Sequence, residues 1–183
     1  MVINCKDLTI NSYVDASYTS HIYGKSHTGY ILKVGDAYLS AKSVKQRVGT
    51  LSSTDAELVA AVDCLKTITW IKELLDEINF VIINKIILYQ DNKSLIILLS
   101  ENSKFKRVKH MMSKLNYARQ LYNDDVYTIN YIPTDEMPAD CLTKPLANIN
   151  FVNDQALKLC VQQLPIYPWS RGCVEILYII FNV

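Results

Sequence analysis

The pattern of apolar and polar residues predicts three strands in the first quarter of the chain. Residues 11–16 (Asn-Ser-Tyr-Val-Asp-Ala) alternate, and two strand-like runs, 29–34 and 37–41, flank a Gly-Asp pair at 35–36. Two such runs across a Gly-Asp pair are typical of a β-hairpin. We therefore expect a first strand, a polar loop over 17–28, and then a hairpin.

A long helix is predicted next, ending near Glu77. Ser and Thr, which are common N-cap residues, occupy 52–54, and the acidic residues Asp55 and Glu57 follow them. From Glu57 onward, helical spacing marks one face, which continues through Ala61, Cys64, Ile68, Ile71 and Leu75. We expect this apolar face to be buried, with Glu57 at its N-terminal end.

The second half alternates between strand and helix patterns. The unbroken β-branched and aromatic run 85–90 predicts a strand buried on both faces. Helices are predicted over 93–100 and 108–122, a strand over 126–132, and a last helical segment over 136–146. Hairpin strands followed by such alternation are typical of an α/β fold, with a mixed sheet and helices on its faces.

The pattern changes after residue 146. A helical pattern over 147–164 is stopped by Pro165 and Pro168, and an apolar end follows. We assign 1–146 to one domain and 147–183 to a C-terminal extension of unknown role. The extension either covers an exposed sheet edge or is poorly ordered.

Composition narrows the class of protein without naming a partner. The 183 residues include 19 Lys and Arg against 18 Asp and Glu, so an electrostatic site must come from local clustering. The five cysteines form no CxxC pair, which disfavours a zinc site, and residues 1–10 lack the apolar core of a signal peptide. The apolar end 176–183 is too short to span a bilayer. We expect a soluble domain with reduced thiols inside the cell and no membrane partner.

Four carboxylates stand where such a fold can bring them together. Asp15 lies in the first strand and Glu57 at the start of the long helix, while Asp91 directly follows the buried strand and Asp140 lies in the last helical segment. Clustered carboxylates repel one another unless cations bind between them. Oxygen donors without Cys or His suit Mg²⁺ or Mn²⁺, and two such ions can promote hydrolysis of a phosphodiester.

Each carboxylate also has a simpler explanation. Thr54 and Glu57 have the spacing of a capping box, and Asp91 before an Asn could start a turn. Asp140 could lie on a solvated helix face, and Asp15 could be an exposed charge at a strand end. The occurrence of all four, in strand-helix-strand-helix order, favours the metal site.

Six short motifs occur in a fixed order between residues 11 and 146. They are YVDASY (13–18), KSHTGY (25–30), LSSTDAE (51–57), QDNKS (90–94), KH (109–110) and ADCLTKPL (139–146). This ordered set resembles the ribonuclease H domain of copia-type LTR retrotransposon Pol polyproteins. Gln90 stands where that family usually has Cys, and we expect it to take no part in the chemistry.

The resemblance implies a ribonuclease H-like fold, a five-stranded mixed sheet flanked by helices. It also implies an endonuclease that hydrolyses the RNA strand of RNA–DNA hybrids during reverse transcription. Asp15, Glu57, Asp91 and Asp140 match the family's catalytic and metal-binding carboxylates, which hold two Mg²⁺ or Mn²⁺ ions. The implied partners are the hybrid and the reverse transcriptase domain of the same polyprotein. The implied location is a virus-like particle in the cytoplasm, or the nucleus.

Local basic clusters predict where nucleic acid binds. Two segments carry cations and no acid, and this pattern fits contacts with phosphates. Asn92 and Ser94, at a predicted helix N-terminus, are placed either to bind phosphate or ribose oxygens or to cap the helix. His110 is expected to make a structural or phosphate contact and no catalytic one. The predicted phosphate-binding residues are Lys42, Lys45, Arg47, Lys104, Lys106, Arg107, Lys109 and His110.

Two other functions compete with that of an active ribonuclease H: a proofreading-type exonuclease and a catalytically silent binding module. A proofreading-type exonuclease requires Asp-x-Glu in its first strand, but Asp15 is followed by Ala16 and Ser17. The alternative that stays open is a catalytically silent remnant of a truncated polyprotein, which would bind nucleic acid or act as a scaffold.

Overall fold

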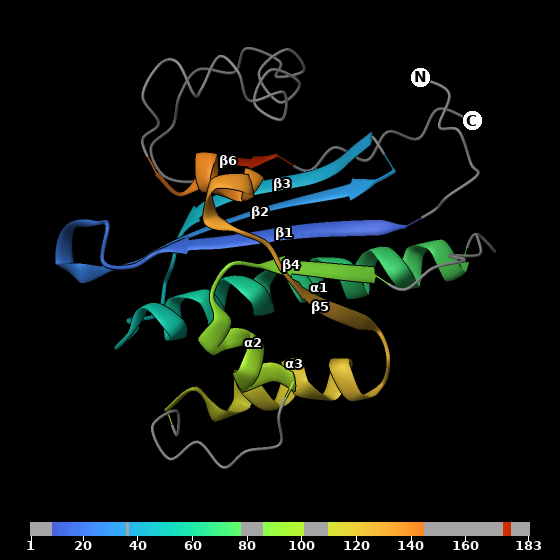
Figure 1. Cartoon of the computed structure of the whole chain (residues 1–183). Helices are drawn as coiled ribbons and strands as arrows, with labels where there is room; N and C mark the ends of the chain where they lie inside the picture. The colour runs from blue at the N-terminus through green and yellow to red at the C-terminus, as the bar shows by residue number, and fades with distance from the viewer. Residues whose placement is uncertain (1–8, 36, 78–85, 101–109, 145–173, 177–183) are drawn as a thin grey trace.

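The described strands form one mixed sheet, and the described α-helices pack on one face of that sheet (Figure 1). The computed structural model describes residues 9–35, 37–77, 86–100, 110–144 and 174–176. The strands are β1 (Ile10–Ser17), β2 (His27–Val34), β3 (Ala37–Lys45), β4 (Ile86–Gln90), β5 (Tyr127–Tyr131) and β6 (Val174–Ile176). The helices are α1 (Ser53–Glu77), α2 (Lys93–Ser100) and α3 (Met112–Asn123).

The strand order is β5-β4-β1-β2-β3-β6. β1 is antiparallel to β2 and parallel to β4, and β4 is parallel to β5. The predicted five-stranded mixed sheet is confirmed by β1 to β5. The short β6, which comes from the segment assigned to the C-terminal extension, pairs antiparallel with the outer edge of β3. The rest of 147–183 lies outside the described residues, so the proposed domain boundary stays a prediction.

The β2–β3 hairpin is longer than its apolar pattern predicts. β2 begins at His27 and β3 continues to Lys45, and these two residues face each other in the ladder. β1 pairs with β2 along its whole length, from Ile10 opposite Val34 to Ser17 opposite His27. Cross-strand hydrogen bonds therefore extend the strands through polar residues that hydropathy alone assigns to loops.

The sequence predicted that β4 is buried on both faces, but only one face of β4 is buried. Ile86, Leu88 and Gln90 are buried, whereas Ile87 and Tyr89 are only half-buried. The α-helices cover one face of the sheet, so alternate residues of β4 reach the core. On the other face, the ring of Tyr89 stacks on that of Tyr13 at 4.9 Å.

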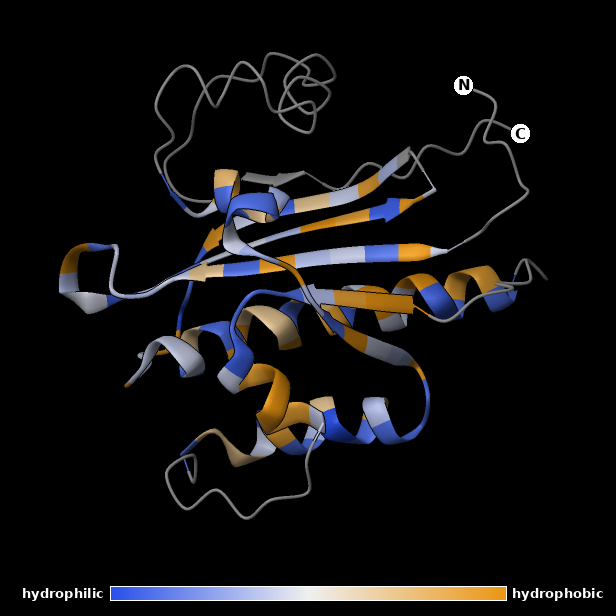
Figure 2. Cartoon of the chain, viewed as in Figure 1, coloured by the Kyte–Doolittle hydropathy of each residue, from blue (hydrophilic) through white to orange (hydrophobic). Residues whose placement is uncertain are grey.

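Helices α1 and α2 lie where the sequence predicts them. α1 ends at Glu77 and α2 spans 93–100, as predicted. α1 is buried on all sides over 55–62, where it lies between the sheet and the other two helices. β4 and α2 are coloured as hydrophobic over most of their length in Figure 2, consistent with their place in this core. No helix within the described ranges has the length and apolar character needed to cross a membrane.

The last helical segment, predicted over 136–146, is not an α-helix. The chain there forms two short 3₁₀ turns, η3 (Thr134–Glu136) and η4 (Pro138–Leu142), and residues 145–146 lie outside the described ranges. Proline disfavours the α conformation of the residue before it, and Met137 before Pro138 has an extended backbone. An α-helix therefore cannot run through this point, and Asp140 lies on a 3₁₀ turn instead.

Truncation of a core side chain on α1 should cost far more stability than truncation of an exposed one just before it. Leu65 is fully buried, whereas Leu51 is 75% exposed. We expect Leu65→Ala to lower the free energy of unfolding by about 2–5 kcal/mol, because it leaves a cavity. The matched control, Leu51→Ala, should change it by less than about 0.5 kcal/mol. Urea denaturation measures both values, and equal effects would contradict the described core.

Candidate active site

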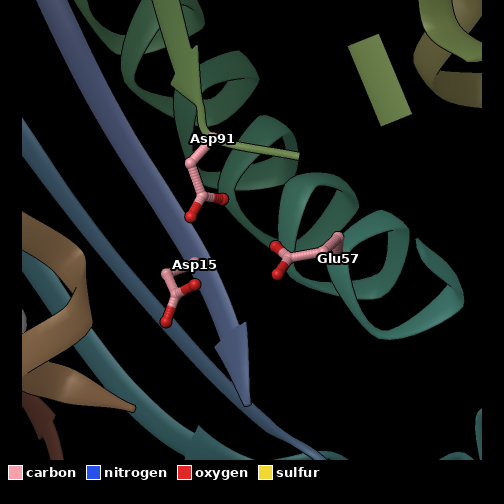
Figure 3. A group of neighbouring side chains, drawn as sticks. All are labelled: Asp15, Glu57 and Asp91. Carbon is pink, nitrogen blue, oxygen red and sulfur yellow. The ribbon is translucent and has the colours of Figure 1, made fainter. Parts of the chain in front are cut away.

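Three of the four predicted carboxylates meet at one edge of the sheet. Asp15 lies near the end of β1, Asp91 directly follows the parallel neighbour β4, and Glu57 lies in the second turn of α1. Each offers one carboxylate oxygen, and these oxygens all lie within 4.8 Å of one another (Figure 3). We call Asp15, Glu57 and Asp91 the carboxylate cluster. Asp15 and Glu57 are buried, and Asp91 is half-buried.

Glu57 is not a capping residue. The N-cap of α1 is Ser52, whose Oγ accepts a hydrogen bond of 3.1 Å from the backbone N–H of Asp55. Asp55 Oδ2 in turn accepts one of 3.2 Å from the N–H of Leu51. The capping interaction thus belongs to Ser52 and Asp55, and the simpler explanation of Glu57 as part of a capping box with Thr54 fails.

The carboxylate of Glu57 is instead held inside the protein. The side-chain Nε2 of Gln90 donates a hydrogen bond of 2.9 Å to Glu57 Oε2, and both residues are buried. A backbone hydrogen bond from Ala16 also favours the charged form. Even so, the pKa of Glu57 lies well above its usual value, because burial and the nearby charge of Asp15 outweigh both hydrogen bonds.

Asp15 is under similar electrostatic pressure. Burial raises its pKa to about 6, and the charges of Asp140 and Asp91 act in the same direction. A hydrogen bond from the hydroxyl of Thr143 to Asp15 Oδ2 and the charge of Lys144 act in the opposite direction. The cluster therefore concentrates negative charge that the surrounding side chains compensate only in part.

Asp91 and Asp140 complete the site. The hydroxyl of Thr134 donates a hydrogen bond of 2.8 Å to Asp91 Oδ2. Asp140 lies outside the group of three but close enough for its charge to raise the pKa of Asp15. Its Oδ2 pairs with the Lys144 ammonium at 2.8 Å, whereas its Oδ1 is buried without a hydrogen-bond partner among the described residues.

The position of Asp140 depends on close packing between η4 and β2. A methyl group added at Gly29 of β2 would lie 2.6 Å from Thr143 Cγ2 and 3.0 Å from the carbonyl oxygen of Ala139. Only glycine therefore lets the turn lie directly on the strand. Ser43 Oγ adds a hydrogen bond of 2.7 Å to the carbonyl oxygen of Leu142.

A chain of hydrogen bonds connects this turn to the β1–β2 loop. Because Ser43 donates its hydroxyl to a carbonyl, it accepts from His27 Nε2 at 2.8 Å. His27 Nδ1 is then an acceptor, and it receives the Nε2–H of His21 at 2.7 Å. Burial, and after it the neighbouring His21, lowers the pKa of His27, which is consistent with a neutral ring.

The donor set fits a hard divalent cation. All four side chains offer carboxylate oxygens, the type of ligand that Mg²⁺ and Mn²⁺ prefer. A buried anionic oxygen without a donor, as at Asp140 Oδ1, is unfavourable unless a cation compensates it. Burial without a compensating cation also raises the pKa values of Asp15 and Glu57. These side chains are therefore able to hold metal ions.

The residues predicted to bind nucleic acid are only partly described. Lys45 and Arg47 are exposed at and just beyond the end of β3, and Lys42 is half-buried on that strand. Ser94 is exposed in the first turn of α2. Lys104, Lys106, Arg107 and Lys109 lie outside the described residues.

Two of the nucleic-acid candidates have structural contacts. Asn92 Oδ1 accepts a hydrogen bond of 3.1 Å from the N–H of Leu95, so Asn92 caps α2 as the simpler alternative proposed. His110 Nε2 lies 3.1 Å from Asp55 Oδ2, which favours a structural role at the start of α1.

Sequence reasoning missed the residues that hold the carboxylates. Gln90, which we expect to take no part in the chemistry, nevertheless holds a site residue in place, because its Nε2 donates a hydrogen bond to Glu57. One signal was available: Gln90 is in phase with the buried Ile86 and Leu88, and a polar residue at a core position needs a polar partner. Thr134 and Thr143 gave no such signal, because their partners are distant in sequence.

The chain is similar in sequence to transposon Pol polyproteins. No protein-family model matches the chain. It is 31% identical over 146 residues to the retrovirus-related Pol polyprotein from transposon TNT 1-94 of Nicotiana tabacum, a match that covers 79% of this chain. It is 28% identical over 147 residues to that from transposon RE2 of Arabidopsis thaliana, which covers 80%. The chain spans about a tenth of the length of the curated relatives it matches.

Solved structures show the fold. LC11-RNase H1, isolated from compost by a metagenomic approach, superposes with a TM-score of 0.59 at 17% identity and covers 82% of this chain and 99% of its own. The same protein in complex with an RNA/DNA hybrid gives 0.52 at 16% identity, covering 73% and 92%. The N-terminal RNase H domain of rv2228c from Mycobacterium tuberculosis gives 0.55 at 14%, covering 85% and 98%. The resemblance drawn from the six motifs is thus confirmed.

Removal of one charge from the cluster should stabilise the metal-free protein. The folded protein binds the Asp15 proton more tightly than the unfolded chain does, because its pKa is about 6 instead of 3.8. The contribution of Asp15 to stability is therefore full below about pH 4 and decreases as the pH rises to about 6. We expect Asp15→Asn to raise the free energy of unfolding at pH 7 by roughly 2 kcal/mol in EDTA. Urea denaturation at pH 4.5 and pH 7 measures this difference.

The control for this experiment is Asp76→Asn, which changes an exposed carboxylate at the far end of α1. It should change the free energy of unfolding by less than about 0.5 kcal/mol, because its side chain is exposed. An Asp15→Asn variant less stable than the unaltered protein at pH 7 would contradict the electrostatic account of the cluster.

Proposed function

The chain is a homologue of transposon Pol polyproteins and has the ribonuclease H fold, and from this premise we propose that it hydrolyses the RNA strand of RNA–DNA hybrids during reverse transcription. The observation that carries the proposal is the carboxylate cluster, with oxygens of Asp15, Glu57 and Asp91 within 4.8 Å of one another and Asp140 beside them. A fold of this kind without such a cluster would support nucleic-acid binding but no hydrolysis.

In this proposal, Asp15, Glu57, Asp91 and Asp140 hold two Mg²⁺ or Mn²⁺ ions. When bound, the ions supply the activation of the attacking water and the stabilisation of the leaving oxygen, and cleavage yields a 5′-phosphate and a 3′-hydroxyl.

The protein's own contribution is to hold the carboxylates in place before the substrate arrives. Thr143, Gln90 and Thr134 each donate a hydrogen bond to one oxygen of Asp15, Glu57 and Asp91, respectively. For Asp15 and Asp91 these contacts, within the described part of the chain, engage Oδ2 and leave Oδ1 for a ligand. Because these donors are neutral, they orient the carboxylates without cancelling their charge.

The substrate side of the proposal rests on position and charge. Exposed Lys45 ends β3, and exposed Arg47 lies on the segment that leads from β3 into α1 and Glu57. Asn92 directly follows Asp91, and Ser94 lies in the first turn of α2. Cations and a helix N-terminus at these places suit contacts with the phosphates of a hybrid. The complex of LC11-RNase H1 with an RNA/DNA hybrid supports this class of substrate. We further propose that Lys104, Lys106, Arg107 and Lys109 extend the phosphate contacts.

We also propose a partner and a cellular location for the chain. Since the matched region is about a tenth of the length of these Pol polyproteins, the proposed partner is the reverse transcriptase domain of the same polyprotein. The proposed location is a virus-like particle in the cytoplasm, or the nucleus.

Cleavage of a labelled RNA–DNA hybrid by the full chain tests this function. With Mg²⁺ or Mn²⁺ we expect the RNA strand to be cut, and with EDTA or single-stranded RNA we expect no cleavage. Asp91→Asn should abolish cleavage while the fold and hybrid binding persist, because it removes a metal-binding charge and little volume. Gel electrophoresis, circular dichroism and fluorescence anisotropy provide the three readouts.

The matched control is Asp124→Asn, an exposed carboxylate after α3 that should leave cleavage unchanged. Retained cleavage in Asp91→Asn would refute its role as a ligand. A folded, unaltered chain that binds the hybrid and does not cut it would favour the catalytically silent binding module instead.

A further inference from the structure

A lysine lies directly beside the proposed metal site. The Nζ atom of Lys144 is 2.8 Å from Oδ2 of Asp140, and the two side chains are 44% and 21% exposed. The charge of Lys144 also acts on Asp15, and those of Asp15 and Asp91 act on Lys144. Its ammonium group is thus attracted by three of the four carboxylates that the metal ions would need.

The backbone keeps this ammonium group near the site. The N–H of Lys144 donates a hydrogen bond of 3.0 Å to the carbonyl oxygen of Asp140. The preceding residue, Thr143, is buried and donates its hydroxyl to Asp15. The start of the lysine side chain is therefore fixed, whereas its four-carbon stem and half-exposed end can move.

A tethered ammonium group and a divalent cation are attracted to the same oxygens. Lys144 pairs with Asp140 Oδ2, and a divalent cation bound to either oxygen of the same carboxylate would repel the nearby ammonium group and weaken its contact. Partial exposure of the pair makes this exchange inexpensive, because ion pairs at the protein surface contribute little net free energy.

We propose that Lys144 is an internal counter-ion of the site, which neutralises Asp140 in the metal-free protein and is displaced from it when a divalent cation binds. The inference rests on the proposed function, since it takes the four carboxylates to be the metal site. Lys144 thereby lowers the affinity of the site for divalent cations and relieves carboxylate repulsion in their absence. It acts as a positioning residue for Asp140.

Calorimetric titration of the full chain with Mn²⁺ at pH 7 tests the proposal. Lys144→Met keeps the length of the side chain and removes its charge, so we expect the Kd for Mn²⁺ to fall roughly threefold to fivefold. Lys144→Arg keeps the charge and can pair more strongly with a carboxylate, so its Kd for Mn²⁺ should not fall below that of the unaltered protein. Lys66→Met is the control, because Lys66 pairs with Asp63 on α1 at 3.9 Å, away from the site, and should have no effect.

A spectroscopic readout separates displacement from a merely structural role. In the unaltered protein, the NMR signal of the Lys144 Cε–Hε group, identified by its loss in Lys144→Arg, should shift on addition of Mg²⁺ with the midpoint of metal binding. The corresponding signal of Lys66 should not move. This measurement decides the matter even if circular dichroism shows that Lys144→Met does not fold.

The outcomes distinguish this inference from the proposed function. Equal Mn²⁺ affinity in a folded Lys144→Met, or a Lys144 signal that stays fixed while Mg²⁺ binds, overturns the counter-ion role and leaves the metal site standing. Absence of Mn²⁺ binding by the unaltered chain overturns both proposals.

Discussion

Repulsion among buried carboxylates is the constraint that the rest of this structure accommodates. Asp15 and Asp91 come together because β1 and β4 are parallel neighbours, so that their carboxyl ends meet at one edge of the sheet. Glu57 joins them from α1, a helix buried on all sides in that region. The apolar core between sheet and helices supplies the free energy that keeps these charges close, since the cluster itself opposes folding at neutral pH.

The choice of neighbours decides what the cluster can do. Its closest described partners are hydroxyl and amide donors, which fix the orientation of a carboxylate and leave its charge available. An arginine in their place would form a strong bidentate pair and neutralise the site permanently. The one basic side chain ion-paired to the site in the described structure, Lys144, is half-exposed and can move away. Such a site retains its attraction for divalent cations.

The turn η4 connects the site to the opposite face of the sheet. It lies on β2 at Gly29, is held by Ser43 through the carbonyl oxygen of Leu142, and reaches Asp15 through Thr143. Asp140 therefore depends on the β2–β3 hairpin for its position as much as on its own segment. A short 3₁₀ turn suffices for this role because packing and hydrogen bonds, not helical periodicity, place the carboxylate.

Local sequence was enough to predict the extent of α1 and α2, the mixed sheet and the convergence of Asp15, Glu57 and Asp91, because caps, periodicity and short motifs act between residues close in the chain. It failed where the answer depends on distant neighbours. Gln90 became a partner of Glu57, and β4 is only half covered, since the tertiary structure alone decides which face receives the helices. Thr143 and Lys144 gained their roles in the same way. Burial and electrostatic coupling arise between elements far apart in sequence, so only the folded chain could determine them.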